Sequence, residues 1–259
     1  MKTKMIALLL ALVMVFALAA CGGGDKDMVY AVEAGSAGEA VALEKGFQVN
    51  SVDTQAKALM EVQSGTSDAA IIDSLMAGAM VGEGTSYPDL VCTDQQLTEE
   101  LYGVACRKGS DLAAYINEVF SETYADGTMQ QIAKTYGVQE ALVEQKAPTG
   151  YTPGADGDVA YIQGKGTLIV GITDFAPMDY KNDAGEWIGF DADMAKIVAE
   201  KLDVEIQFVE IDWDNKVFEL DGKAIDVVWN GMTLTDAMLE AAECTNAYCN
   251  NAQVVVTKK

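Results

Sequence analysis

The sequence contains no histidine, and this absence removes several kinds of chemistry at once. A Ser–His–Asp triad, a histidine general base and a metal site with imidazole ligands all require that residue. Basic residues are also scarce, with 17 lysines and arginines against 40 aspartates and glutamates. A surface this acidic repels phosphate backbones. We therefore expect neither a metal site, nor a cofactor, nor a nucleic-acid partner.

Prolines are few and glycines are many, four against 24, in a chain of 259 residues. This balance favours tight turns between strands and helices over a proline-rich stalk. Half of the residues are apolar, which is enough for a substantial core. The length suits one large domain or two lobes of about 100 to 150 residues each.

A long apolar run occurs only near the N-terminus, over residues 5–17, after Lys2 and Lys4. The run is too short to span a bilayer comfortably and is typical of a removable signal. It leads into Leu-Ala-Ala-Cys, ending at Cys21, which resembles the lipobox of bacterial lipoproteins. The alternative is an ordinary signal peptide followed by a chance cysteine. We expect a signal peptide over 1–20, a lipid on Cys21, a flexible tether over 21–27 and a lipid-anchored, extracytoplasmic location at the bacterial cell membrane.

Four further cysteines follow in this exported context, where disulfides are permitted. They are not in a Cys-x-x-Cys pattern, and a chain of this size does not need covalent crosslinks. We expect small buried or half-buried residues, with disulfides as the alternative, at Cys92, Cys106, Cys244 and Cys249.

Short apolar runs typical of strands alternate with amphipathic helical segments, which is the pattern of an α/β fold. The segment 146–158, KAPTGYTPGADGD, interrupts this alternation with two of the four prolines and predicts a linker. On either side of it, a helix that ends at a glycine is followed by an apolar strand that ends at a polar residue. Two lobes of similar build would produce this weak repeat, and so would chance similarity within one fold class. Strands are expected at 29–32, 48–52, 69–72, 102–106, 167–171, 204–209, 225–229 and 252–257.

Polar, small and aromatic residues follow several of the expected strands. In open parallel α/β sheets, ligands bind outside the carboxyl ends of the strands, so these residues are expected to converge. Carboxylates would bind an ammonium group, backbone N–H groups at helix N-termini a carboxylate, and aromatic rings the body of a small zwitterion. Each residue alone could instead be a helix cap or a turn residue. The candidates are Gly35, Ser36, Asp73, Thr173, Asp174, Phe175, Asp212, Trp213, Asn230, Gly231 and Thr233.

Five segments resemble the family 3 extracellular solute-binding proteins, the amino-acid receptors of ABC importers. Residues 164–178, GKGTLIVGITDFAPM, are similar to the opening of that family, and 189–195, GFDADMA, to one of its helix starts. Residues 230–235, NGMTLT, are similar to its ligand loop, 102–109, YGVACRKG, to its return hinge strand, and 124–129, YADGTM, to its terminal helices. The resemblance implies a type II periplasmic binding protein, with two doubly wound α/β lobes, a ligand cleft and a two-strand hinge.

The order of these segments differs from that of the family, as in a circular permutation. The resemblance places the second family lobe at 28–98, and the hinge strand with the terminal helices that pack on the first lobe at 99–147. A linker at 148–163 would join the former ends, and 164–259 would form the first family lobe and the outgoing hinge strand. Permutation at an exposed connection is tolerable when the joined ends lie close. An artefact of gene assembly is the alternative explanation.

The resemblance also implies roles for individual residues. Asp73 matches the family's ammonium-contacting acid, and Phe175 and Trp213 match its stacking positions. Met238 stands where the family usually has an arginine for the ligand carboxylate, which predicts altered selectivity for free α-amino acids. Lys216 is the nearest basic residue that could replace it, although the simpler expectation is that Lys216 points to solvent.

These observations predict a non-enzymatic, monomeric receptor that binds a small polar, amino-acid-like solute and passes it to an ABC permease. A sensor domain that acts through a partner protein is one alternative. A dehydratase-like enzyme with Asp174 or Asp212 as general acid is another. The last alternative is a non-binding remnant whose cleft the permutation has disrupted.

Overall fold

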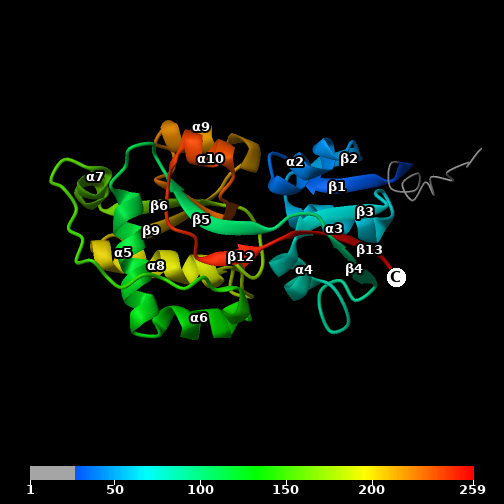
Figure 1. Cartoon of the computed structure of the whole chain (residues 1–259), viewed down its shortest axis with the longest axis horizontal. Helices are drawn as coiled ribbons and strands as arrows, with labels where there is room; N and C mark the ends of the chain where they lie inside the picture. Colours follow the sequence, from blue (N-terminus) through cyan, green and yellow to red (C-terminus); the bar gives the residue numbers. More distant parts are fainter. Residues whose placement is uncertain (1–26) are drawn as a thin grey trace, which may run out of the picture.

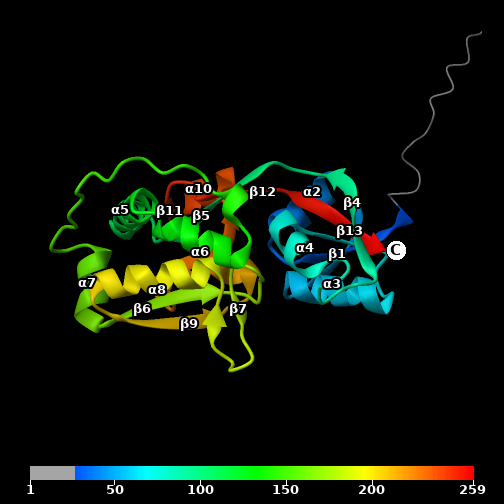
Figure 2. The ribbon, with the colours of Figure 1, turned by 90° about the horizontal axis from the view of Figure 1, so that it is seen from below.

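The computed structural model describes residues 27–259, which form two lobes, each a β-sheet covered by helices (Figure 1). The signal peptide, Cys21 and all but the last residue of the tether lie outside the described residues. Within 27–259, no helix is both long enough and apolar enough to cross a membrane. Two extended segments run between the lobes (Figure 2).

Lobe A (residues 27–96 and 253–259) is built on a five-stranded sheet with the order β2-β1-β3-β13-β4. The strands β1, β2 and β3 are parallel and are linked by helices, whereas β13 is antiparallel to both β3 and β4. The central strand β3 is buried along its whole length, as expected for a strand covered on both faces. The elements are β1 (Val29–Glu33), α2 (Ala37–Glu44), β2 (Gln48–Val52), α3 (Gln55–Ser64), β3 (Ala69–Asp73), α4 (Ser74–Met80), β4 (Leu90–Gln96) and β13 (Gln253–Lys258).

Helix α3 shows how local sequence defines these elements. The Thr54 side chain accepts a hydrogen bond from the Lys57 amide at its start, and Gly65 adopts a left-handed φ of 85° at its end. Ala58, Leu59 and Val62 form its buried face. Their spacing of one, three and four residues places them on one side of a helix.

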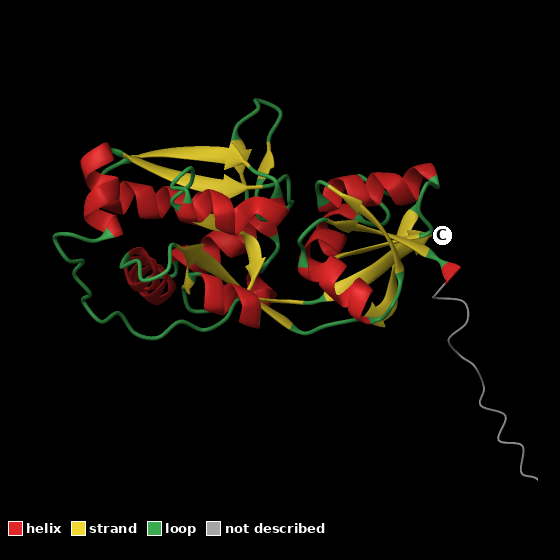
Figure 3. Cartoon of the chain, turned by 90° about the horizontal axis from the view of Figure 1, so that it is seen from above, coloured by secondary structure: helices red, strands yellow, loops and turns green. Residues whose placement is uncertain are grey.

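Lobe B (residues 100–251) is built on a second sheet with the order β11-β5-β10-β6-β9, and β12 also pairs with β5. Helices cover it on both sides (Figure 3). The strands are β5 (Glu100–Cys106), β6 (Thr167–Ile172), β9 (Glu205–Glu210), β10 (Val227–Thr233), β11 (Glu243–Cys244) and β12 (Cys249–Asn251), with a small hairpin of β7 (Tyr180–Lys181) and β8 (Trp187–Ile188). The helices are α5 (Leu112–Ala125), α6 (Thr128–Tyr136), η1 (Gln139–Ala141), α7 (Asp158–Lys165), α8 (Phe190–Leu202), η2 (Trp213–Asn215), α9 (Lys216–Asp221) and α10 (Asp236–Ala241).

The chain passes between the lobes twice. Residues 97–99 connect β4 to β5, and Ala252 connects β12 to β13. The two crossings are bonded to each other, because the Gln253 amide donates to the Thr98 hydroxyl at 2.8 Å and the Leu97 amide donates to the Gln253 carbonyl at 2.8 Å. The last strand of the chain therefore lies in the sheet of its first strands.

The linker expected over 148–163 is shorter, because helix α7 begins at Asp158. Val159 and Ile162 are buried three residues apart, and the Asp111 carboxylate accepts a hydrogen bond from the Val159 amide at 3.1 Å. The segment before α7 runs past the outside of α5, where the Glu118 carboxylate accepts bonds from Thr149 and Gly150 (Figure 2). Val159 and Ile162, two apolar residues in a short run flanked by glycines, were the sequence feature that could have predicted this helix.

Three further expectations need correction. Strand β10 continues to Thr233, so Asn230, Gly231 and Thr233 lie within the strand and not after it. Strand β4 was not predicted, because most of its side chains are exposed and polar. The four cysteines of the described chain are free, and Cys92 is exposed rather than buried or half-buried.

Candidate functional site

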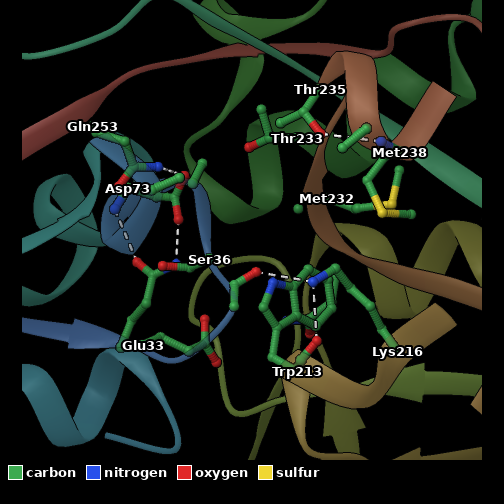
Figure 4. Close-up of a pocket in the computed structure, with 17 residues that line it drawn as sticks. Glu33, Ser36, Asp73, Trp213, Lys216, Met232, Thr233, Thr235, Met238 and Gln253 are labelled. Atoms are coloured by element: carbon green, nitrogen blue, oxygen red, sulfur yellow. Dashed lines mark hydrogen bonds between the residues drawn. The ribbon is translucent and has the colours of Figure 1, made fainter. Parts of the chain in front are cut away.

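A cavity of about 230 Å³ lies between the lobes (Figure 4). Lobe A lines it with the ends of β1 and β3 and the start of α2, and lobe B lines it with η2, β10 and the start of α10. The lining includes Glu33, Gly35, Ser36, Gln55, Asp73 and Gln253 from lobe A, and Trp213, Lys216, Asn230, Gly231, Met232, Thr233, Thr235 and Met238 from lobe B.

Seven of the eleven candidate residues line this cavity, namely Gly35, Ser36, Asp73, Trp213, Asn230, Gly231 and Thr233. Phe175 does not, which corrects the expectation that it flanks the ligand. Its side chain is 2% exposed and packs edge-on against Tyr102, with ring centroids 6.4 Å apart. Gly231 makes room for it, since an added Cβ there would lie 2.2 Å from the Phe175 ring.

Asp174 also lies away from the cavity. It lines a separate surface pocket together with Tyr136, Tyr180 and Lys181. Thr173 is buried and forms a reciprocal pair with Asn230: its amide donates to the Asn230 Oδ1 at 3.0 Å, and Asn230 Nδ2 donates to its hydroxyl at 2.8 Å. Asp212 precedes η2 without lining the cavity.

The loop after β1 brings the lobes close together. Gly35 adopts φ 69°, and an added Cβ would lie 2.7 Å from the Cα of Asp214 in lobe B. The Ser36 hydroxyl caps α2 by accepting from the Glu39 amide at 3.1 Å. The amides of Gly35 and Ser36 donate to the Glu39 carboxylate and the Glu33 carbonyl, at 2.8 and 3.2 Å. These two backbone donors are thus occupied within the loop.

Asp73 joins both crossings to the end of β3. Its carboxylate accepts hydrogen bonds from the Tyr102 hydroxyl at 2.8 Å and Gln253 Nε2 at 2.9 Å, and from the amides of Asn251 and Gln55. Burial, and next the charge of Glu100, raises the pKa of Asp73 to about 7, although several of these bonds oppose the rise. Most of its acceptor capacity is therefore used by the protein.

Glu33, the last residue of β1, was not among the predicted site residues. It is 3% exposed, and within the described chain its Oε1 has no hydrogen-bond partner. Burial raises its pKa to about 8, with a smaller contribution from the charge of Asp73, while the Thr173 hydroxyl, Lys216 and Gln55 lower it. A glutamate at the end of an apolar strand, just before the loop of Gly35, was the sequence feature that could have revealed it.

Lys216 is buried rather than pointing to solvent. Its Nζ donates to the carbonyls of Gly35 at 2.9 Å and Trp213 at 3.0 Å, and lies 4.8 Å from the centroid of the Trp213 ring. Burial lowers its pKa. Figure 4 shows this ammonium group beside Trp213, where it faces the loop of lobe A.

Methionines supply the apolar wall of lobe B. Met232 and Met238 are 1% and 7% exposed, and the Met238 amide donates to the Thr235 hydroxyl that caps α10, at 3.2 Å. The chain has a single arginine, Arg107. Its guanidinium binds the Ile225 carbonyl at 2.9 Å and Asp226 and Asp158 at 3.3 and 3.1 Å, away from the cavity lining.

No cluster of three or more potential metal ligands occurs among residues 27–259. The site therefore consists of hydrogen-bonding groups, two buried carboxyls, one lysine and apolar side chains between two lobes. Such an arrangement can surround a small polar molecule on both sides.

Residues 168–259 match the sequence profile of the bacterial extracellular solute-binding proteins, family 3. The arginine-binding extracellular protein ArtP of Bacillus subtilis (strain 168) is 32% identical over 97 residues, which are 37% of this chain and 38% of ArtP. The L-cystine-binding protein TcyJ of Escherichia coli (strain K12) is 30% identical over 99 residues, 38% of this chain and 37% of TcyJ. These alignments span under two fifths of the curated relatives.

Among solved structures, an ancestral cationic amino acid solute-binding protein is 36% identical over 32% of this chain and 37% of its own, with a TM-score of 0.31. The protein has an α/β fold of two lobes that are joined by two extended crossings. Over residues 168–259 it is similar to the family 3 extracellular solute-binding proteins.

Proposed function

We propose that this protein is an extracytoplasmic solute-binding protein that takes up a small, polar, amino-acid-like molecule between its lobes and delivers it to an ABC permease. The observation that carries the proposal is the interlobe cavity, lined from both sides by buried polar groups and by Trp213. ArtP and TcyJ are named for the amino acids they bind, and the family match covers residues 168–259, which contribute η2, β10 and α10.

In this proposal the two crossings act as the hinge. Residues 97–99 and Ala252 are short, so the lobes are free to open on the side of the cavity far from them. A ligand that contacts both lobes favours the closed arrangement, which the permease would recognise. We further propose anchoring by lipid at Cys21 and a monomeric state.

A binding role is favoured over catalysis. The family consists of binding proteins, and Asp174 and Asp212, the acids considered for dehydratase chemistry, do not line the cavity. The cavity has no histidine, since the chain has none.

We also propose that the chain is circularly permuted, with 28–98, 99–147, the linker 148–163 and 164–259 in the roles given above. Support comes from the family match, which occupies only the C-terminal part, and from β13, which returns to the first sheet. A chain reordered as 164–259 followed by 28–147 should fold and bind the same ligand.

The function is tested by a thermal-shift screen of the mature chain against the twenty amino acids, their amides and their decarboxylated amines. A specific ligand raises the melting temperature, by a free energy of about 2.7 kcal/mol at one hundred times its dissociation constant. Calorimetry then measures the affinity. The absence of any stabilising compound in the whole screen contradicts the proposal.

A further inference from the structure

Glu33 is the residue of the cavity lining whose carboxyl is only partly paired: Thr173 and Gln55 hydrogen-bond to it, but its Oε1 has no partner in residues 27–259. It ends β1, which pairs in parallel with β3, the strand that ends at Asp73. Neighbouring strands lie about 4.8 Å apart, so the two carboxyls emerge close together at one edge of the sheet. Figure 4 shows Glu33 and Asp73 on the lobe A side of the cavity, facing Trp213 and Lys216 of lobe B.

The two carboxyls differ in what they still have to offer a ligand. The carboxylate of Asp73 already accepts from Tyr102, Gln253, Asn251 and Gln55. By contrast, Glu33 lines the cavity and its buried Oε1 has no hydrogen-bond partner in residues 27–259. A buried acceptor that is left unpaired is costly, and a donor from the ligand would remove that cost.

The charges of the lining favour a cation. Glu33, Asp73 and Lys216 are the ionisable residues among those that line the cavity, so a single added positive charge balances them once both carboxyls are ionised. A ligand carboxylate would oppose the ionisation of both carboxyls. Lys216 is already bonded to the carbonyls of Gly35 and Trp213, and Arg107 is held by Asp158 and Asp226.

Three backbone amides near the cavity are occupied as well. The amides of Gly35, Ser36 and Met238 are bonded to Glu39, Glu33 and Thr235. Lobe B also contributes apolar surface, from Met232, Met238 and the Trp213 ring. This wall suits the hydrocarbon part of an amine.

We propose that the cavity selects a small organic monocation, a primary amine or an amino-acid amide without a free carboxylate, and that Glu33 is the specificity-determining residue that accepts its ammonium group. This inference rests on the proposed function and names the class of its solute.

Calorimetry of the mature chain at pH 7 with matched probes tests the inference. One series is leucine, leucinamide and 3-methylbutylamine, and the other is phenylalanine, phenylalaninamide and 2-phenylethylamine. We expect the amide and the amine of at least one series to bind ten times more tightly than the free amino acid. The variant Glu33→Gln should weaken amine binding at least tenfold, Glu33→Asp should restore part of it, and Glu44→Gln, an exposed control at the end of α2, should change nothing.

A second experiment uses the unmodified chain, so it still tests the inference if the Glu33→Gln variant does not fold. Alkylamines are fully protonated at pH 7, since their pKa lies near the value of about 10.4 of lysine. Because the free protein holds a proton on Glu33, amine binding should release a proton, measured as a difference in binding enthalpy between phosphate and Tris buffers. Equal binding enthalpies in the two buffers, after correction for proton exchange by the probes themselves, contradict the inference.

Failure of this inference and failure of the proposed function are distinguishable. Tighter binding of the free amino acids than of their amides and amines overturns the inference but leaves a solute-binding protein. If a folded Glu33→Gln variant binds amines as tightly as the unmodified chain, the inference is also overturned and the solute-binding function is not. Absence of binding by both series and by all twenty amino acids overturns both.

Discussion

The ammonium group of Lys216 in lobe B donates a hydrogen bond to the carbonyl oxygen of Gly35 in lobe A, at 2.9 Å and across 181 residues of sequence. The bond lies at the cavity, apart from the crossings at 97–99 and Ala252. It therefore links the lobes at the place where they would separate on opening. In the arrangement described here, the lobes are therefore held together partly by the protein itself.

Replacing Lys216 with methionine should shift the free protein toward an open arrangement. The side chain keeps a similar length but loses the donor, and a hydrogen bond from a charged group is worth about 1.5 to 3 kcal/mol. We expect a larger radius of gyration in small-angle X-ray scattering. Lys45→Met, at an exposed lysine directly after α2, is the control and should leave the radius unchanged. Equal radii for the two variants contradict a role of Lys216 in closure.

Alanine at Gly35 should interfere with closure, whereas alanine at Gly46 should not. Both glycines have positive φ, 69° and 71°, so each substitution costs roughly 1 kcal/mol of backbone strain. Only at Gly35 does the added Cβ meet the other lobe, at Asp214, while Gly46 has nothing within 4 Å. We expect similar losses of melting temperature but weaker ligand binding in Gly35→Ala alone. If both variants bind equally well, the close approach at Gly35 does not matter for the bound state.

The protein should become less stable as the pH rises from about 5 to 8. The pKa of Glu33 rises from 4.5 in the unfolded chain to about 8, and that of Asp73 from 3.8 to about 7. Between these limits the folded state holds protons that the unfolded state has released, and each such group lowers the free energy of unfolding by about 1.4 kcal/mol per pH unit.

Urea unfolding at several pH values measures this slope. Glu33→Gln should reduce it by about 1.4 kcal/mol per pH unit, since the neutral amide no longer titrates. Glu44→Gln should leave it unchanged. A free energy of unfolding that increases over this range would contradict the assignment of buried, protonated carboxyls.

Asp73→Asn should destabilise the protein and weaken ligand binding. An amide oxygen replaces one acceptor, and an NH₂ group is introduced among the donors of Tyr102, Gln253 and Asn251. We expect a loss of about 1.5 to 3 kcal/mol in the free energy of unfolding. Asp53→Asn, at an exposed aspartate paired with Lys57, is the control and should cost less than about 0.5 kcal/mol. Equal denaturation midpoints for the two variants argue against a structural role of Asp73.

The fold was largely accessible from the sequence because its central strands are continuous apolar runs with turn residues after them. The strands predicted at 69–72, 167–171 and 204–209 are confirmed with shifts of one residue at their ends. The edge strand β4 was not predicted, because its side chains are mostly polar and exposed and do not alternate between apolar and polar. Helix α7 escaped because it has only two buried apolar residues in a glycine-rich context.

The sequence predicted those residues of the site that lie at or directly after the ends of strands. Gly35 and Asp73 lie at the carboxyl ends of strands in the lobe A sheet, and Trp213 and Gly231 lie near those of the lobe B sheet. The carboxyl ends of parallel strands form one edge of each sheet, and the two edges meet at the cavity. The direction of a side chain after a strand is not determined by this rule, so Phe175 was misplaced. It packs on the core side, where Gly231 leaves space.

The position of β13 has a consequence for biosynthesis. This strand lies between β3 and β4 in the sheet of lobe A, yet it is made about 180 residues after β3, as the bond between Gln253 and Asp73 shows. At 5 to 20 residues per second, β3 emerges roughly 10 to 40 s before its partner. During that interval the edges of β3 and β4 that later pair with β13 have no neighbour, and β3 is rich in alanine and isoleucine. The lobe that is begun first is thus completed last, and its assembly depends on a non-local pairing that forms slowly.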